Sequence, residues 1–316
     1  SVQPALRRSV ELVRKLDVLE ARLRPRTPAG PGRSLLERLR KAYSANLMRA
    51  VSVLKRFDRD GSGTIERGEF EVVVAGGTES MSQLPFYMLG ARKGYRLGQG
   101  ELVDGMYRDG FHCPMADQLM GATAENLAEE FSITRDEQDA YAVETQQRCE
   151  RARQSDLFAD EIAAVEIPGR KGPTVISVDE HPRDGANLAS MAKLKPVFKK
   201  DGTVHAGNSS GITDGACALV IASEEVAKAE GWPILAVLGS SSRGGVEPHR
   251  MGMGPVPAIH ALLEKTGQNL SDYAGFAIKA AFAAQVLACL REIEIDPAKL
   301  NVHGGAIALG HPIGAT

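Results

Sequence analysis

Residues 58–69 carry oxygen-bearing side chains at the spacing that a calcium ion requires. The run reads Asp-Arg-Asp-Gly-Ser-Gly-Thr-Ile-Glu-Arg-Gly-Glu. Ca²⁺ is a hard cation that binds about six to eight oxygen atoms, and a short loop can supply them around a glycine that permits a sharp bend. With Gly63 at the bend, the predicted ligands are Asp58, Asp60, Ser62, the backbone carbonyl of Thr64, Glu66 and Glu69.

This pattern resembles the loop of an EF-hand in which every ligand position is filled. An EF-hand also needs a helix after the loop, whereas the next residues, Phe70-Glu-Val-Val-Val-Ala-Gly-Gly77, are typical of a strand. EF-hands work in pairs, and the sequence contains no second loop of this kind. Two interpretations therefore stay open: a loop that binds Ca²⁺ weakly, and a loop that binds no ion.

A histidine in a glycine-rich turn is the second candidate for chemistry. Residues 310–314 read Gly-His-Pro-Ile-Gly, and the imidazole of His311 is suited to move a proton near neutral pH. On its own, such a histidine is also typical of a packed residue in a glycine turn. The cysteines are widely spaced, form no Cys-x-x-Cys pair and lie in no motif typical of a reactive cysteine; they are Cys113, Cys149, Cys217 and Cys289. We expect reduced, partly buried thiols of an intracellular protein.

The composition is that of an ordinary globular protein, with 316 residues, 43% hydrophobic and 25% charged. No run of about 18 apolar residues predicts a membrane span. The charge is uneven: residues 1–71 hold 16 Lys and Arg against 9 Asp and Glu, while the remainder carries an acidic excess of nine. Since the basic residues alternate with acids, we expect solvated helix faces rather than a surface for nucleic acid or a transit peptide.

The pattern of apolar residues and breakers predicts alternating helices and strands, and therefore an α/β fold. A capping box of Thr134 and Glu137 is expected inside a helical region that breaks at Ser132. The predicted helices span 4–24, 34–57, 122–154, 256–267 and 283–292, and the predicted strands span 72–77, 175–178, 216–222, 274–278 and 306–309. Residues 207–215 are too rich in glycine for either element and are expected to form a loop.

Several motifs together resemble the thiolase family in order and spacing over residues 72–316. The most specific is Asn301-Val-His-Gly-Gly-Ala-Ile-Ala-Leu-Gly-His-Pro-Ile-Gly314; others are Val74-Ala-Gly-Gly-Thr-Glu-Ser-Met-Ser82, Leu119-Met-Gly-Ala-Thr-Ala-Glu-Asn126, Thr203-Val-His-Ala-Gly-Asn-Ser-Ser-Gly-Ile-Thr-Asp-Gly-Ala216 and Met251-Gly-Met-Gly-Pro255. The resemblance implies part of a layered αβαβα fold with a loop domain at about 111–235. Residues 1–71 form a separate basic helical segment in this scheme, ending in the calcium loop.

The resemblance also implies chemistry on coenzyme A (CoA) thioesters. Thiolases cleave 3-ketoacyl-CoA with CoA, or condense two acetyl-CoA units, through an acylated cysteine. His311 matches the histidine that activates this cysteine. The matched CoA contacts are Ser210 at the pantetheine amide with Ala206 beside it, Met120 and Phe282 as apolar walls, and Arg183 near a phosphate.

This sequence departs from the family pattern at the residues that do the chemistry. Lys279-Ala-Ala-Phe282 stands where the family has Asn-Glu-Ala-Phe, so Lys279 replaces the asparagine that orders a water in the oxyanion hole. The motifs of both reactive cysteines are missing from the 316 residues. A gapped alignment would put Ser44 at the nucleophile position, but the calcium loop interrupts it. We therefore expect an impaired enzyme.

Three hypotheses about function remain. The first is a thiolase-like acyltransferase that has lost nearly all catalysis and keeps a site for CoA or acyl-CoA. The second is a calcium-binding EF-hand regulatory or scaffold protein, and the third is an artificial junction without a selected function. We expect a homo-oligomer without nucleic-acid or membrane partners. We expect it in the cytoplasm, with mitochondria and peroxisomes as the other compartments left open.

Overall fold

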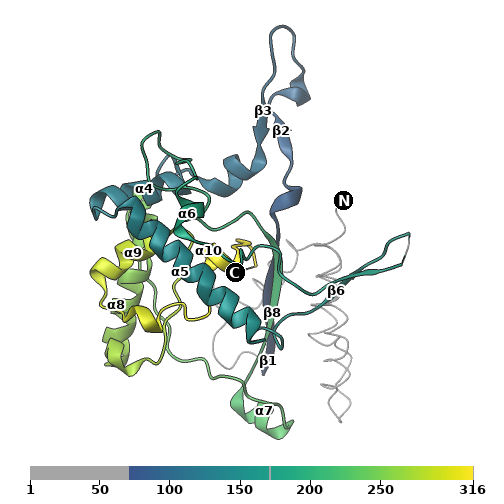
Figure 1. Ribbon diagram of the computed structural model, residues 1–316. Helices are drawn as coiled ribbons and strands as arrows, with labels where there is room; N and C mark the ends of the chain where they lie inside the picture. The colour runs from purple at the N-terminus through teal and green to yellow at the C-terminus, as the bar shows by residue number, and fades with distance from the viewer. Residues whose placement is uncertain (1–70, 171, 316) are drawn as a thin grey trace.

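The computed structural model describes residues 71–170 and 172–315 (Figure 1). The predicted helices at 4–24 and 34–57 and the six predicted calcium ligands, Asp58, Asp60, Ser62, Thr64, Glu66 and Glu69, lie outside these ranges. Calcium binding therefore stays a prediction from the sequence.

Two consecutive helices, α4 (Met120–Glu130) and α5 (Arg135–Gln154), form one side of the core. The predicted break between them is confirmed at Ser132, whose φ is 51°. The capping box is also confirmed: the side chain of Thr134 accepts a hydrogen bond from the Glu137 N–H, and the Glu137 carboxylate accepts one from the Thr134 N–H at 2.8 Å. This reciprocal pairing satisfies N–H groups that have no partner within a helix, and so fixes where α5 begins.

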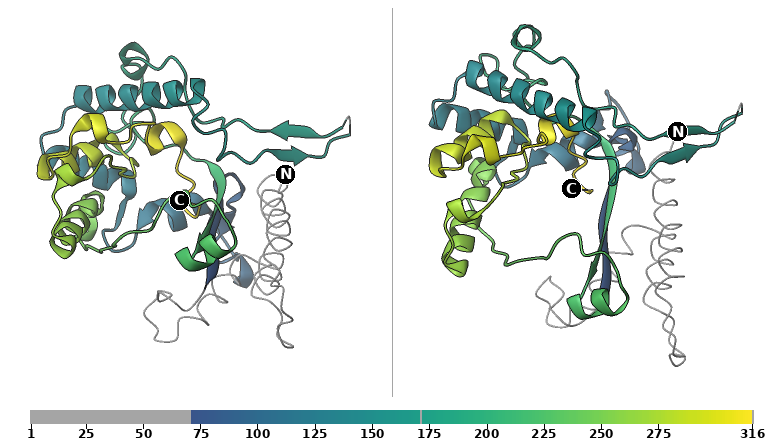
Figure 2. Two further views of the ribbon diagram at one scale, coloured as in Figure 1. Left: turned by 90° about the horizontal axis from the view of Figure 1, so that it is seen from below. Right: turned by 60° about the horizontal axis from the view of Figure 1, so that its bottom comes forward.

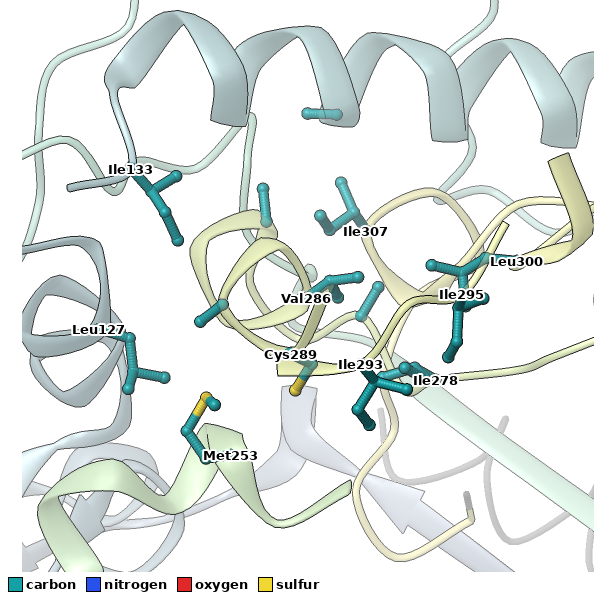
Figure 3. Packing of buried hydrophobic residues seen from close by; sticks show 14 of the residues in the cluster. Leu127, Ile133, Met253, Ile278, Val286, Cys289, Ile293, Ile295, Leu300 and Ile307 are labelled. Carbon is teal, nitrogen blue, oxygen red and sulfur yellow. The ribbon is translucent and has the colours of Figure 1, made fainter. Parts of the chain in front are cut away.

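Helix α9 (Ala283–Glu292) lies at the centre of the core, against α4 and α5. Its bounds are those predicted, and Val286 and Cys289 are fully buried. Figure 3 shows these two side chains among Leu127 of α4, Met253 and Ile307. Burial of such side chains is the main favourable term in folding.

The strands of the described residues form four two-stranded antiparallel sheets. The longest pair joins β1 (Val72–Ser80) to β8 (Asp214–Ala222), in a register that sets Gly77 opposite Cys217. The other pairs are β2 (Phe86–Met88) with β3 (Leu102–Asp104), β4 (His112–Cys113) with β5 (Gln118–Leu119), and β6 (Val165–Ile167) with β7 (Thr174–Ile176). The β2–β3 and β6–β7 hairpins extend away from the body (Figures 1 and 2).

The remaining elements are short, apart from one helix. That helix, α8 (Pro255–Thr266), confirms the prediction of a helix over 256–267. The others are α6 (Leu188–Met191), α7 (Glu224–Ala229), α10 (Ala306–Leu309), a π-helix at Met106–Phe111, and 3₁₀ turns at Met81–Gln83, Ala91–Lys93, Pro248–Met253, Leu270–Asp272 and Pro297–Lys299. Among the described helices, none combines the length and the apolar character that crossing a membrane requires.

Two predicted strands are wrong. Residues 306–309 form helix α10, and residues 274–278 make only an isolated parallel bridge between Phe276 and Leu300. An apolar run of four residues does not distinguish a helix from a strand by its periodicity. Here the outcome is set by α5, because Thr145 Oγ1 accepts a hydrogen bond from the Gly305 N–H at 2.7 Å and so fixes the start of α10.

A comparison of two glycine variants tests how closely the turn before α10 approaches α5. Gly304 has φ of 91°, and a Cβ atom there would lie 2.8 Å from the Cβ of Cys149. Gly267, which ends α8, has φ of 69° but open space around it. We expect Gly267→Ala to cost about 1–2 kcal/mol from backbone strain, and Gly304→Ala to cost roughly 1–3 kcal/mol more from overpacking. Urea unfolding measures the free energy of unfolding of both variants. Equal losses of stability would contradict a close approach of this turn to α5.

Candidate active site

The turn that carries His311 lies along one face of strand β8. A Cβ on Gly310 would be 2.8 Å from Thr213, and a Cβ on Gly215 would be 2.5 Å from the Pro312 ring. Cys217 Sγ donates a hydrogen bond to the carbonyl of Ala315 at 2.6 Å. Alternate residues of a strand point to the same face. The contacts at positions 213, 215 and 217 therefore align residues 310–315 with the start of β8 and the residue before it.

Lys279 enters this site from a segment that Asn301 fixes. The Asn301 side chain accepts a hydrogen bond from the Ile278 N–H and donates one to the Ile278 carbonyl, both at 3.0 Å. This bidentate contact holds the residue before Lys279. Burial lowers the pKa of His311, and the neighbouring charge of Lys279 lowers it further. Burial also lowers the pKa of Lys279, although much of that side chain is exposed, and the charge of Cys217 opposes this shift.

The charge of Lys279 thus contributes to the lowered pKa of His311. The imidazole is kept neutral in this environment, so it can accept a proton at neutral pH. The arrangement combines a base, a cation and a thiol. Sequence analysis did not predict that Cys217 lies at this turn. The small residues at alternate positions, Thr213, Gly215 and Cys217, are the signal that could have indicated a close approach on one strand face.

The loop that contains Ser210 pairs with the start of α9. Ser210 N–H donates to the Ala281 carbonyl at 2.7 Å, and a β-bridge joins Ser209 to Phe282. The structure thus places Ser210 next to the segment that begins with Lys279. Ala206 is exposed, at the turn that precedes this paired part of the loop.

Phe198 packs against Phe282 and against Gly121, the residue that follows Met120. The Phe198 ring covers Gly121, the neighbour of Met120, and meets the Phe282 ring edge-to-face with the centroids 6.1 Å apart. All three side chains are half-buried. Phe198, which sequence analysis did not single out, therefore links Phe282 to the start of α4, where Met120 lies.

Arg183 is exposed and is connected to the site through its backbone and through His181. The Arg183 N–H donates to Gln146 Oε1 at 3.0 Å. The His181 ring packs on Gly211, and its Nε2 lies 3.1 Å from the Ile307 carbonyl oxygen. Residues 181–183 therefore lie against α5, the Ile307 carbonyl and Gly211.

A hollow of about 480 Å³ lies near Arg183, between the end of α5 and residues 177–184. Its charged lining is mostly acidic, with one cation that forms an ion pair at 2.8 Å with Asp184; the charged residues are Glu150, Asp156, Asp179, Asp184 and Arg153. An anion would be repelled from this hollow. We therefore do not expect a phosphate to bind in this hollow.

The described residues contain no cluster of three or more His, Cys, Asp or Glu arranged to hold a metal ion. The site is thus built from the β8 face, the residues 279–282, the Ser210 loop and the His311 turn. Its chemical capacity is proton transfer and thiol chemistry beside an apolar wall.

Comparison with known proteins gives one family. The model described as "Thiolase, N-terminal domain" matches residues 59–225, and "Thiolase, C-terminal domain" matches residues 232–316. An acetyl-CoA acetyltransferase of Pseudomonas aeruginosa is 49% identical over 257 residues, which are 81% of this chain and 65% of that protein. A probable acetyl-CoA acyltransferase of Staphylococcus epidermidis is 48% identical, over 80% of this chain and 64% of that protein.

Solved structures agree with this result. Human mitochondrial 3-ketoacyl-CoA thiolase in complex with CoA is 44% identical, with a TM-score of 0.73 over 78% of this chain and 62% of that chain. Acetyl-CoA acetyltransferase from Syntrophomonas wolfei is 38% identical, with a TM-score of 0.77 over 91% and 75% of the two chains. The expected α/β thiolase-like fold is thereby confirmed. The chain spans slightly less than two thirds of the length of the two curated relatives.

A lysine variant tests the electrostatic coupling in the site. We expect Lys279→Met to raise the pKa of His311 towards its ordinary value, because the cation that disfavours the imidazolium is removed. His181 is the internal control: burial, with Arg183 nearby, lowers its pKa, so it should titrate as before. NMR titration of the two imidazoles, in the parent chain and in the variant, measures the pKa values of His311 and His181. An unchanged His311 pKa would show that Lys279 lies too far away to act on it.

Proposed function

Because this chain belongs to the thiolase family, we propose that it binds CoA thioesters at the site between the Ser210 loop and the His311 turn, for acyl transfer of the thiolase type. The observation that supports this proposal is the connection between the Ser210 loop and the His311 turn. The Ser210 loop is paired with residues 281–283, and the His311 turn lies on β8, which continues from the same loop.

In this proposal the pantetheine arm lies along Met120 and Phe282, with Phe198 packed against Phe282. The Ser210 hydroxyl contacts a pantetheine amide, with Ala206 beside it, and Arg183 contacts a phosphate. Apolar walls with a few placed polar groups are the usual design of such sites. The name of the human relative bound to CoA supports this choice of ligand.

His311 would act as the base of the reaction. Its lowered pKa keeps the imidazole unprotonated near neutral pH, so it can take the proton of a thiol and return it to the leaving group. The proposed substrates are CoA and short or long acyl-CoA, with the acyl length left open. A homo-oligomer remains the expected assembly.

We propose that this 316-residue chain turns over slowly. Lys279 occupies the position where thiolases have an asparagine, and a flexible ammonium does not replace a fixed amide as a donor to a developing oxyanion. In addition, none of its four cysteines lies in a reactive-cysteine motif.

Binding of CoA is tested by thermal unfolding with increasing CoA. We expect the unfolding temperature to rise, because a ligand that binds the folded state stabilises it. Ser210→Ala should weaken binding roughly twofold to tenfold through the loss of one hydrogen bond. Ser240→Ala is the matched control, since Ser240 is exposed in a different segment. No stabilisation by CoA, or equal effects of the two variants, would contradict this site.

Turnover is tested by following thiolysis of acetoacetyl-CoA with CoA. We expect a rate near the uncatalysed background, because losses of a nucleophile or an oxyanion donor each reduce rates by orders of magnitude. Multiple turnover that iodoacetamide abolishes would contradict slow catalysis and would show an efficient cysteine in this chain.

A further inference from the structure

The imidazole of His205 is fully buried and joins the Ser210 loop, residues 203–210, to helix α5. Its Nε2 lies 2.7 Å from Oδ1 of Asp139, a residue that is 5% exposed. Its Nδ1 accepts a hydrogen bond from the Gly207 N–H at 3.0 Å. Because a backbone N–H can only donate, Nδ1 carries no proton. The ring is therefore the neutral tautomer that donates from Nε2 to Asp139.

The carboxylate of Asp139 accepts hydrogen bonds from two further side chains. Its Oδ2 accepts one from Arg135 Nε at 2.9 Å, and its Oδ1 accepts one from Asn208 Nδ2 at 3.1 Å. Asn208 is also fully buried, and its Oδ1 accepts a hydrogen bond from the His205 N–H at 2.8 Å. The pair of His205 and Asp139 thus belongs to a buried polar network, and a network of this kind favours one arrangement of the chain.

The same network shapes the loop that carries two of the predicted CoA contacts. The His205 carbonyl accepts a hydrogen bond from the Asn208 N–H at 3.1 Å and another from the Ser209 hydroxyl at 2.8 Å. This turn encloses Ala206, which is exposed, and leads directly to Ser210. The ring of His205 therefore supports the loop from its buried side, whereas Ala206 is on the side that a ligand can reach.

The space around Gly207 is tightly filled. A Cβ atom on Gly207 would lie 2.5 Å from Leu194 Cδ1, 2.6 Å from Met191 Sδ and 3.1 Å from the His205 ring. Both Met191 and Leu194 are uncharged, and their carbonyls accept hydrogen bonds from Arg135 at 2.8 and 2.9 Å. Gly207 is thus confined between this segment and the imidazole, so its N–H cannot turn to another acceptor without movement of the loop.

Protonation of His205 would remove the acceptor of the Gly207 N–H. Both ring nitrogens of an imidazolium are donors. A protonated Nδ1 would face the N–H of Gly207, and two opposed donors would replace a hydrogen bond. The Nε2–H bond to Asp139 would persist, so the change is confined to the turn that contains Ala206.

The charges that act on the ring come from two helices. They are those of Asp139 and Arg135 on α5 and of Glu125 on α4. Burial lowers the pKa of His205, while the hydrogen bond to Asp139 opposes this shift. The neutral ring is therefore favoured at neutral pH, and the proton is taken up in more acidic solution.

We propose that His205 is a positioning residue of the CoA site, whose neutral ring, held by Asp139, keeps the Ser210 loop in the conformation that places Ala206 and Ser210 for the pantetheine arm. In the acid form the hydrogen bond from Gly207 is lost, and the loop no longer holds these contacts in place. Affinity for the pantetheine arm is thus full while the ring is neutral and falls as the ring takes up a proton. This inference rests on the proposed CoA site.

The test is calorimetric titration of the 316-residue chain with pantetheine from about pH 8 to about pH 5, across the ordinary range of histidine. Pantetheine has no phosphate, so the ligand itself does not titrate in this range. NMR of the His205 ring in the same samples measures its tautomer and its protonation. We expect the affinity to fall roughly twofold to tenfold, in parallel with protonation of His205, through loss of one hydrogen bond. An affinity that stays constant over this range would overturn the proposal.

Two histidine variants assign the pH effect to one ring. His205→Gln retains a donor for Asp139 and removes the ring acceptor, so we expect weaker binding of pantetheine that does not change with pH. His311→Gln is the matched control, and it should keep the pH effect because His311 lies outside the network. A pH effect that persists in His205→Gln and is absent from His311→Gln would overturn the proposal. If His205→Gln fails to fold by urea unfolding, the parallel measurements on the parent chain still decide.

The outcomes separate this inference from the proposed function. If CoA and pantetheine bind with affinities that do not depend on pH, the CoA site stands and His205 is not its positioning residue. If neither ligand binds at any pH, both proposals fall. A fall in affinity that follows the protonation of His205 supports both.

Discussion

The placement of His311 depends on residues 301–315, a segment that contains the short helix α10 and is fixed between helix α5 and strand β8. On the helix side, Thr145 accepts a hydrogen bond from the backbone of Gly305. On the strand side, Gly215 leaves space for the Pro312 ring. Because α5 and β8 are separated by some 60 residues and the loop follows both of them in the chain, the geometry of the base is a property of the tertiary fold.

The same loop is tied to the hydrophobic core. Leu300 and Ile307, on either side of the glycine turn, are at most 2% exposed. Complete burial of one such side chain contributes roughly 1.5–3 kcal/mol relative to exposure, as an upper estimate. These two anchors offset the ordering of a segment that contains several glycines, for which the loss of backbone entropy on folding is largest. The site is therefore held by packing as well as by hydrogen bonds.

Local signals predicted the elements that depend on neighbours in sequence, such as the cap at Thr134 and helix α9. Local signals did not predict the helical conformation of residues 306–309. There the Gly305 N–H donates a hydrogen bond to Thr145, which lies on another helix. The grouping of Ser210, Lys279 and His311 followed from resemblance to a family, and their contacts follow from the fold. The approach of Cys217 to the turn could not be deduced, because it requires the pairing of a strand with a segment 98 residues later.

The residue at position 279 has two opposite consequences for the site. A cation stabilises nearby negative charge, although a flexible ammonium does so without the fixed direction of an amide donor. The same cation disfavours the imidazolium of His311, and the imidazole becomes a weaker base although more of it is unprotonated. An amide at this position would donate a fixed hydrogen bond without lowering the basicity of the histidine. Lys279 thus disfavours the protonated form of His311, which an amide at the same position would not do.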